Sequence, residues 1–285
     1  MKPSVKYLVI YKHRDKYSIS TMCKFFNVSR SGYYDFVKRL GKPNKNEYIV
    51  DMIRECQERS RKTYGYRRVQ IWLERQHGIM LNPKTILRIM RQHNLLSEIR
   101  RRKKYKQLGR QLHKYDNLLN RQFTADKPNK KWVTDISYIH TKQGVLYLSV
   151  IRDLYDNSIV SYKTGTEQTV NLVLNTIRDA KVKEKVTTEL QLHSDQGFQY
   201  TSTGYFNLTK EYGITPSMSR RGNCYDNACA ENFFGILKAE CIYRVKLKSF
   251  DEARRLIDDY IYFYNNERIQ LKTKLTPYEK RRQLA

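Results

Sequence analysis

The 285-residue sequence lacks several features that mark common classes of protein. It has no apolar run of about 18 residues or more, which argues against a membrane-spanning helix. The apolar patch near the N-terminus is only four residues long, so we expect no signal peptide. The five cysteines show no paired zinc-ligand spacing, which favours reduced thiols over a zinc site or disulfides. No heptad repeat is sustained, which predicts no zipper coiled coil in this chain.

Acidic residues are scarce beside basic ones, with 28 Asp and Glu against 55 Lys and Arg and a net charge of +27. Residues 1–128 carry a net charge of +21 (31 basic against 10 acidic), and residues 129–285 carry +6 (24 against 18). A basic first half before a nearly balanced second half is typical of a DNA-gripping region followed by a folded catalytic region. On charge alone, a ribosomal-type basic protein stays an alternative.

Three carboxylates are the strongest functional signal. Asp135 interrupts an apolar, β-rich run, and Asp195 closes another. Glu231 lies in a stretch of helical character, and Lys238 follows it by about two helical turns on the same face. Mg²⁺ prefers oxygen ligands, and two ions about 3.5–4 Å apart are a common device for displacement at phosphorus. We therefore predict that Asp135, Asp195 and Glu231 are the metal-binding catalytic residues.

The segments that contain these residues resemble a known family. The matching motifs are TDISYI (134–139), HSDQG (193–197), SRRGNCYDNACAENFFGILKAE (219–240) and YNNERIQLKTKLTPYEKR (264–281), with further similarity at 19–36 and 64–96. On these motifs the chain resembles the DDE transposases of the insertion-sequence three family, in particular their second-reading-frame product, within the retroviral-integrase superfamily. One departure is Gln270, where relatives often carry His, and we do not expect this position to be catalytic.

The resemblance implies Mg²⁺-dependent DNA cleavage and strand transfer at the ends of a bacterial insertion sequence, by a copy-out route. Two Mg²⁺ ions are expected per site, with Mn²⁺ able to substitute, and Asp135 is expected to bridge both ions. Lys238 is expected to contact the element end. The implied partners are double-stranded DNA (the terminal inverted repeats and the target), at least a second copy of the chain, and an upstream protein joined by frameshifting. The expected location is cytoplasmic, at the nucleoid.

Other functions stay open as alternatives. A catalytically silent DNA-binding regulator of transposition would keep the same basic regions. A ribonuclease H nuclease would share the core but would not explain the basic, helix-rich residues in front of it. A tyrosine recombinase is disfavoured, because no histidine of this chain has arginine three positions later.

The predicted fold class is α+β, with all-α helix-turn-helix domains in front of a ribonuclease H-like (integrase-type) mixed α/β catalytic domain. Three β-rich runs followed by helix, strand, helix, strand and helix give the element order of that fold. The predicted domains are 1–44 (helix-turn-helix), 45–98 (a second, helix-turn-helix-like domain), 99–129 (basic linker), 130–245 (catalytic core) and 246–285 (C-terminal helical tail).

Candidate DNA contacts follow from basic residues on predicted helices and in the linker. They are Arg30, Ser31 and Lys38; Lys84, Arg88 and Arg91; Arg100, Arg101, Arg102, Lys103 and Lys104; and Arg220 and Arg221. An ordinary helical hairpin or spacer with a solvated basic face is the alternative for the first two groups. Tyr33 and Tyr34 are expected to pack the core of the first domain.

Several polar residues near the acidic motifs have a structural interpretation. Asp153 and Asp156 flank a predicted turn, where turn chemistry explains them without catalysis. Asp226 and Asn227 are predicted to cap the helix that carries Glu231. His193 is interpreted as a structural hydrogen-bonding residue rather than a metal ligand.

Overall fold

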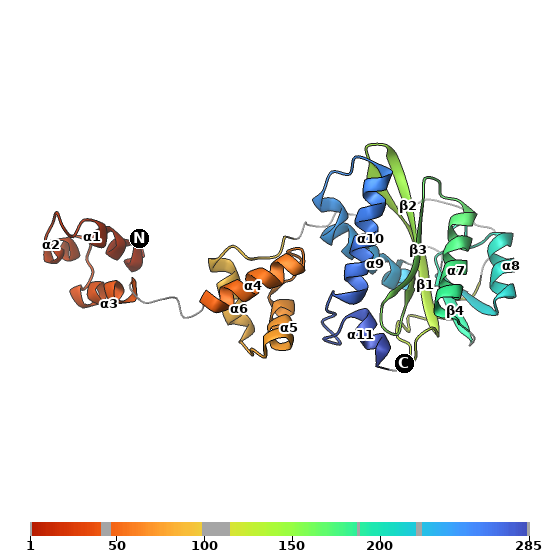
Figure 1. Cartoon of the computed structure of the whole chain (residues 1–285), viewed down its shortest axis with the longest axis horizontal. Coiled ribbons are helices and arrows are strands. Elements are labelled where there is room, and N and C mark those ends of the chain that lie inside the picture. The colour runs from red at the N-terminus through yellow and green to blue at the C-terminus, as the bar shows by residue number, and fades with distance from the viewer. Residues whose placement is uncertain (1, 41–46, 99–114, 187–188, 221–223, 284–285) are drawn as a thin grey trace. The chain divides into compact units, whose positions relative to one another are not determined.

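The computed structural model describes residues 2–40, 47–98, 115–186, 189–220 and 224–283. The chain divides into two compact units, Met1–Arg54 and Glu55–Ala285, and its elements are labelled in Figure 1. Along the described ranges, no helix has the length and apolar character needed to cross a membrane.

The first unit is built on helices that pack on one another: α1 (Pro3–Lys12), α2 (Ile19–Phe25) and α3 (Arg30–Leu40). Its core is made of Ile10, Met22, Cys23 and Tyr33. The Ser29 hydroxyl accepts a hydrogen bond from the Gly32 amide (3.1 Å) and thereby caps the start of α3. Tyr34 is exposed, so its predicted core position is wrong. Neighbouring residues on a helix point about 100° apart, so the side chain of Tyr34 points away from the core that buries Tyr33.

Three further helices follow: α4 (Glu47–Arg59), α5 (Tyr66–His77) and α6 (Pro83–Gln92). Gly78 ends α5 with a left-handed φ of 66°, a conformation that glycine adopts without a steric penalty. The Asn82 side chain accepts from the Lys84 amide and caps α6, with Pro83 at the first helical position. The apolar faces of α5 and α6 are buried through Val69, Trp72, Leu73, Ile86, Ile89 and Met90.

A five-stranded sheet in the order β3-β2-β1-β4-β5 forms the centre of the second unit. Its strands are β1 (Lys131–Thr141), β2 (Gly144–Asp153), β3 (Ile159–Gly165), β4 (Leu190–Ser194) and β5 (Ile214–Met218). The first three strands pair antiparallel, and β4 and β5 run parallel to β1. This arrangement agrees with the predicted ribonuclease H-like fold.

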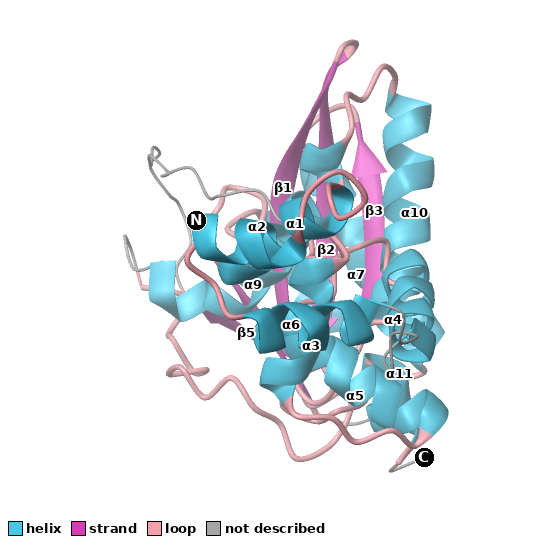
Figure 2. Cartoon of the chain, turned by 90° about the vertical axis from the view of Figure 1, so that its left-hand side faces the viewer, coloured by secondary structure: helices cyan, strands magenta, loops and turns pink. Residues whose placement is uncertain are grey.

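Helices cover both faces of this sheet: α7 (Val170–Glu184), α8 (Thr203–Glu211), α9 (Ala228–Glu240) and α10 (Phe250–Asn266), followed by α11 (Pro277–Arg282). The helix α7 contacts β2 and β3, and α8 contacts β5; α9 contacts β1 and β2, and α10 contacts β1 and β3. Figure 1 shows α7 and α8 on one side of the sheet and α9 and α10 on the other. Figure 2 shows α10 running beside β3.

Alternate residues of β1 face the two helical layers, which fixes where its carboxylate points. Trp132 and Ile136 belong to the core that includes residues of α7 and α8. Val133 belongs to a separate cluster with Ala230 of α9. Asp135 is two residues beyond Val133 on the same strand, so it lies on the face that α9 covers.

The C-terminal segment is joined to α9 by a buried ion pair. Glu240 at the end of α9 binds Arg268 (Nη2–Oε1, 2.7 Å), and Tyr260 of α10 donates to the same carboxylate (2.7 Å). Glu240 therefore points away from the face that carries Glu231, as the helical spacing predicts.

Candidate active site

Strand pairing brings Asp135 and Asp195 together. The parallel pair of β1 and β4 ends at Val133 opposite His193, and each aspartate is two residues further along its own chain. Because side chains alternate along a strand, residues two beyond a registered pair point to the same face as that pair. Asp135 and Asp195 are therefore neighbours at the end of β4, on adjacent segments of the sheet.

The segment after β4 holds Asp195 in a tight turn. Its Oδ1 accepts a hydrogen bond from the amide of Gly197 (2.9 Å). A Cβ at Gly197 would lie 3.0 Å from that same oxygen and 3.1 Å from Oε1 of Gln199, closer than ordinary van der Waals contact. Any larger residue in place of Gly197 in the HSDQG motif would require these two side chains to move by a few tenths of an ångström. Asp135 Oδ1 accepts from the amide of Ile136 (2.7 Å).

Glu231 lies in the first turn of α9, the helix that packs against β1 and β2. Ala230 is buried with Val133 and Leu154, so the start of α9 is fixed against the same face as Asp135. The Glu231 side chain itself is exposed. Lys238 is partly buried two turns further along α9.

The three carboxylates and Lys238 form one electrostatic group. Burial raises the pKa of Asp135 well above its usual range, and the charges of Asp195 and Glu231 raise it further. Burial raises the pKa of Asp195, and burial followed by the charge of Asp195 raises the pKa of Glu231. Burial lowers the pKa of Lys238, which the charge of Asp135 opposes. The three carboxylates are thus close enough to repel one another, and their ionised forms are disfavoured by burial and by this repulsion. Sites that bind metal ions commonly have this property.

The donor set fits a hard divalent cation, although its carboxylates are not gathered around one point. Among the residues that the structure describes, no three His, Cys, Asp or Glu side chains are close enough together to hold a metal ion. Asp135, Asp195 and Glu231 nevertheless supply carboxylate oxygens, the ligands that Mg²⁺ prefers. A cation among them would relieve the repulsion that raises their pKa values.

His193 has the structural position that we predicted. Its side chain is fully buried at the end of the pairing between β4 and β1, and its Nδ1 forms a hydrogen bond with the Ser217 hydroxyl (2.8 Å). Burial lowers the pKa of His193 to about 4, so the ring is neutral near pH 7. It packs β4 against β5.

Asp226 does not cap α9, and that prediction is wrong. Its buried carboxylate accepts instead from Nε and the backbone amide of Arg220 (2.9 and 3.1 Å), from Arg121 (3.0 Å) and from Asn117 (2.9 Å). The Asn227 side chain makes no capping bond either. Its amide nitrogen donates to the carbonyl of Thr134 (3.5 Å), the residue before Asp135. Long-range partners replace the local cap in both cases.

Asp226→Asn is expected to lower the free energy of unfolding by about 1–3 kcal/mol, since it weakens hydrogen bonds to a charged group. The Arg220 guanidinium lowers the pKa of Asp226, so this carboxylate stabilises the fold above its unfolded pKa and loses the effect only at strongly acidic pH. Urea unfolding at pH 7 measures the loss. Asp126→Asn, at an exposed surface pair with Lys130, is the control and should change little.

The candidate DNA contacts lie in different surroundings. Most of those that the structure describes are exposed: Arg30, Ser31 and Lys38 on α3, and Lys84, Arg88 and Arg91 on α6. Arg220 is engaged with Asp226, although its side chain is 58% exposed. The remaining candidates, Arg100 to Lys104 and Arg221, lie outside the described residues. All of them stay predictions.

Sequence reasoning did not single out Arg152, a buried arginine whose Nη1 donates to the carbonyl of Cys229 in the first turn of α9 (2.5 Å). The available signal was a positive charge at the end of the apolar run VLYLSVIRD (145–153). Buried arginine in such a strand needs partners, but the sequence alone does not indicate which residues provide them.

Family models match three parts of the chain. Integrase core domain models match residues 125–224 and 231–284, and an HTH-like domain model matches residues 43–103. Together with the observed sheet order, these matches define an integrase-type polynucleotidyl transferase that follows an HTH-like region.

Relatives identify the family within that class. The chain is 38% identical over 276 residues to the putative transposase InsK of insertion sequence element IS150 from Escherichia coli (strain K12), covering 96% of this chain and 97% of that protein. It is 32% identical over 264 residues to transposase InsF of insertion sequence IS3A from the same strain, covering 90% of this chain and 91% of that protein. The chain belongs to the insertion-sequence three (IS3) family of DDE transposases.

Two further comparisons are more partial. An uncharacterized transposase-like protein of Haemophilus influenzae is 41% identical over 206 residues, covering 72% of this chain and 95% of that protein. Among solved structures, a chain in the structure of the simian T-cell lymphotropic virus intasome in complex with PP2A regulatory subunit B56 gamma aligns with a TM-score of 0.49 at 17% identity, over 74% of this chain and 70% of that chain.

Proposed function

We propose that this transposase catalyses the Mg²⁺-dependent cleavage of DNA at the ends of its insertion sequence and the transfer of those ends to a new site. The observation that carries the proposal is the electrostatic group formed by Asp135, Asp195 and Glu231. These residues come from β1, the segment directly after β4, and α9. Burial of Asp135 and then the charges of Asp195 and Glu231 raise the pKa of Asp135. Carboxylates that interact electrostatically and have shifted pKa values are typical of functional sites.

Asp135, Asp195 and Glu231 would together hold two Mg²⁺ ions. Metal binding would supply activation of the attacking oxygen and stabilisation of the leaving oxygen at the scissile phosphate. Mn²⁺, another cation that accepts oxygen ligands, would substitute.

Lys238 would bind a phosphate of the element end beside the scissile bond. It lies on the same helix as Glu231, and its charge lowers the pKa of Asp135, so its ammonium group is within electrostatic reach of the site. Burial disfavours the charged form of Lys238, so a phosphate beside it would stabilise the ammonium group. Its role would be to orient the DNA strand.

The exposed basic residues of α3 and α6 would grip DNA outside the catalytic site. In a helix-turn-helix the second helix enters the major groove with its N-terminal residues near the base edges, which favours Arg30 and Ser31 for sequence reading. Lys84, Arg88 and Arg91 would contact phosphates, and Arg220 would do so beside the catalytic site. Action at two element ends favours at least a dimer, and the frameshift-fused upstream partner stays a prediction from family resemblance.

Strand transfer by purified protein on a labelled, pre-cleaved element end tests this proposal. Wild type with Mg²⁺ is expected to give joined product, and Glu231→Gln is expected to give none because it removes a metal-binding charge. Glu211→Gln, at an exposed residue of α8, is the matched control and should react like wild type.

Equal product from wild type and Glu231→Gln would contradict the carboxylate assignment. Tight DNA binding without product from either protein would favour the silent regulator or a need for the upstream partner. Repeating the assay with the fused protein separates these two outcomes, because only the second predicts that activity is restored.

A further inference from the structure

Arg152 is a charged side chain buried on the face of the sheet that α9 covers. It is next to last in β2 and only 7% exposed. In the antiparallel pair of β1 and β2 it stands opposite Val133, which packs with Ala230 of α9. Because opposed residues on antiparallel strands share a face, Arg152 lies on the same face as Asp135, one diagonal position away.

The guanidinium of Arg152 is attached to the helix that carries Glu231. Its Nη1 donates to the carbonyl oxygen of Cys229 at 2.5 Å. Cys229 is the second residue of α9 and precedes Glu231 by two positions. A charge-assisted bond to a backbone carbonyl fixes the main chain itself, and within one helical turn the main chain is rigid. The position of the Cys229 carbonyl therefore sets the position of the Glu231 backbone.

The same guanidinium group of Arg152 is also hydrogen-bonded to the turn between β2 and β3. Its Nε donates to the carbonyl of Asn157 (3.4 Å). Asp153 accepts from the Tyr155 amide (2.9 Å), and Asp156 accepts from the Ser158 amide (2.7 Å), which confirms the predicted turn chemistry. The turn is thus a fixed base from which the arginine reaches α9.

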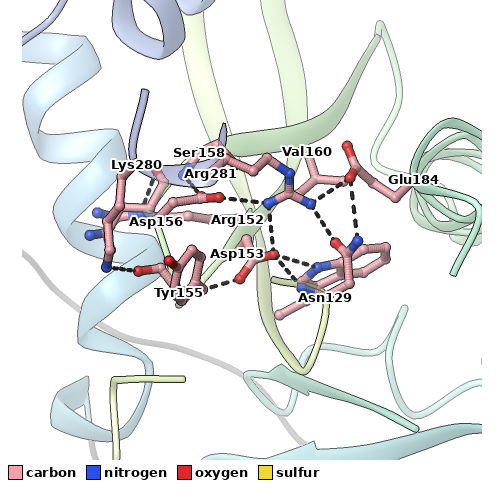
Figure 3. A network of polar contacts seen from close by, with 12 residues as sticks. Asn129, Arg152, Asp153, Tyr155, Asp156, Ser158, Val160, Glu184, Lys280 and Arg281 are labelled. Carbon is pink, nitrogen blue, oxygen red and sulfur yellow. Dashed lines mark hydrogen bonds and ion pairs between the residues drawn. The ribbon is translucent and has the colours of Figure 1, made fainter. Parts of the chain in front are cut away.

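This turn is itself anchored by the C-terminal helix, as Figure 3 shows. Arg281 of α11 binds Oδ2 of Asp153 (3.0 Å) and Oδ2 of Asp156 (2.7 Å). Nη2 of Arg281 donates to Oδ1 of Asn129 (2.6 Å) and to Oε2 of Glu184 at the end of α7. The chain of contacts therefore runs from α11 through the turn and Arg152 to the first turn of α9.

We propose that Arg152 is a positioning residue that holds Glu231 in register with Asp135 through the carbonyl of Cys229. The inference rests on the proposed function, because it assumes that Glu231 is a metal ligand. Without this bond, the first turn of α9 would depend on its apolar contacts and on the long hydrogen bond from Asn227 to the carbonyl of Thr134 (3.5 Å), and could shift along the sheet. Residues that orient metal ligands are commonly worth about 10–100-fold in metal affinity or activity.

Arg152→Met tests the proposal, because it keeps much of the side-chain length and removes every donor. Lys183→Met is the matched control. Lys183 lies on a different helix, α7, and its ammonium group also donates to a backbone carbonyl, that of Val160 in β3 (3.0 Å). Arg152→Lys keeps one charged donor and serves as a second variant if the methionine variant folds poorly. Three quantities are measured: amide hydrogen exchange in α9, Mn²⁺ affinity by electron paramagnetic resonance, and strand transfer against Mg²⁺ concentration.

Arg152→Met is expected to speed exchange in the first half of α9 by about tenfold or more, as loss of a charged hydrogen bond predicts. Its Mn²⁺ affinity should fall by about tenfold or more, and high Mg²⁺ should restore part of its strand transfer. Arg152→Lys should lie between this variant and wild type, and Lys183→Met should match wild type in all three measurements.

Wild-type exchange and Mn²⁺ affinity in Arg152→Met, beside a loss of metal affinity in Glu231→Gln, would overturn this inference and leave the proposed function intact. If Glu231→Gln itself binds Mn²⁺ and transfers strands like wild type, Glu231 is no ligand, and both proposals are wrong. A merely structural role for Arg152 would lower the melting temperature without moving the Mg²⁺ requirement, which also contradicts the inference.

Discussion

Asp135→Asn is expected to abolish strand transfer while making the metal-free protein more stable. Asp135 is the carboxylate whose pKa burial raises most clearly, with the charges of Asp195 and Glu231 adding to the effect. A carboxylate whose folded pKa is raised stabilises the fold less as pH rises from its unfolded pKa through its folded pKa. At pH 7 the ionised form therefore costs stability, and asparagine removes that cost in nearly the same shape.

The loss of activity follows from the same charge. Cation binding contributes several kcal/mol to charge stabilisation at the phosphate, which corresponds to about a thousandfold in rate. The melting temperature without metal should rise by about 2–4 °C, the shift that about 1 kcal/mol gives in a domain of this size. Asp135 is thus predicted to be required for strand transfer and to lower the stability of the metal-free protein.

Thermal melts with and without Mg²⁺ measure this effect alongside the strand-transfer assay. Mg²⁺ should raise the melting temperature of wild type, because a ligand that binds only the folded state stabilises it, and should leave Asp135→Asn unchanged. Asp126→Asn is the control for charge removal at an exposed residue. A destabilised Asp135→Asn, or one that still transfers strands, would show that Asp135 has another role.

The elements that the sequence predicted well depend on local patterns. The β-rich run around Asp135, which forms β1, and the turn chemistry of Asp153 and Asp156 involve residues only a few positions apart. The positions of Asp135 and Asp195 could also be inferred, because strands of this fold meet at a common edge. In each case the information lies within one segment or in a known order of segments.

The predictions that were wrong or incomplete concern residues whose partners are distant in sequence. Asp226 looks like a cap from its neighbours, yet its carboxylate binds Arg121, which is 105 residues earlier. Asp153 was correctly placed in a turn, but its ion pair with Arg281, 128 residues later, has no local signal. Helix α1 (Pro3–Lys12) was not expected, and it buries little beyond Ile10. Polar pairs between residues distant in sequence are therefore the feature that the structure reveals and the sequence does not predict.

Arg281→Met is expected to cause the largest loss of stability, about 3–5 kcal/mol in the free energy of unfolding, as breaking one side of a buried ion pair commonly does. Arg281 is the cation between Asp153 and Asp156, both of which are fully buried. Its removal leaves two buried negative charges beside each other, with neutral hydrogen-bond donors and the electrostatic attraction of Lys280 as their remaining described interactions.

The loss should depend on pH in a definite direction. Burial and the charge of Asp156 already raise the pKa of Asp153, and Arg281 opposes that shift. In Arg281→Met the pKa should rise further, so the ionised carboxylate costs more stability near pH 7 than in wild type. As pH falls and the carboxylate takes up a proton, that cost disappears. The difference between wild type and variant is therefore largest near neutral pH and shrinks toward pH 4.

Urea unfolding at several pH values measures the difference, and neighbouring residues provide the controls. Arg282→Met changes an exposed arginine of the same helix and should cost little. Arg281→Met combined with Asp156→Asn should recover a substantial part of the loss, since the second change removes one uncompensated charge. An Arg281→Met variant within about 1 kcal/mol of wild type at pH 7 would mean that water or other groups compensate the two aspartates.

The Arg281→Met variant also tests whether helix α11 influences the catalytic site. The turn that Arg281 anchors is the base from which Arg152 reaches the carbonyl of Cys229. If α11 only stabilises the fold, Arg281→Met at a temperature where it stays folded should transfer strands like wild type. If the turn also fixes Arg152, the folded variant should need more Mg²⁺, as Arg152→Met does, because both changes release the first turn of α9. A shared Mg²⁺ requirement, without additive effects in the double variant, would place the two arginines in one chain of contacts that ends at Glu231.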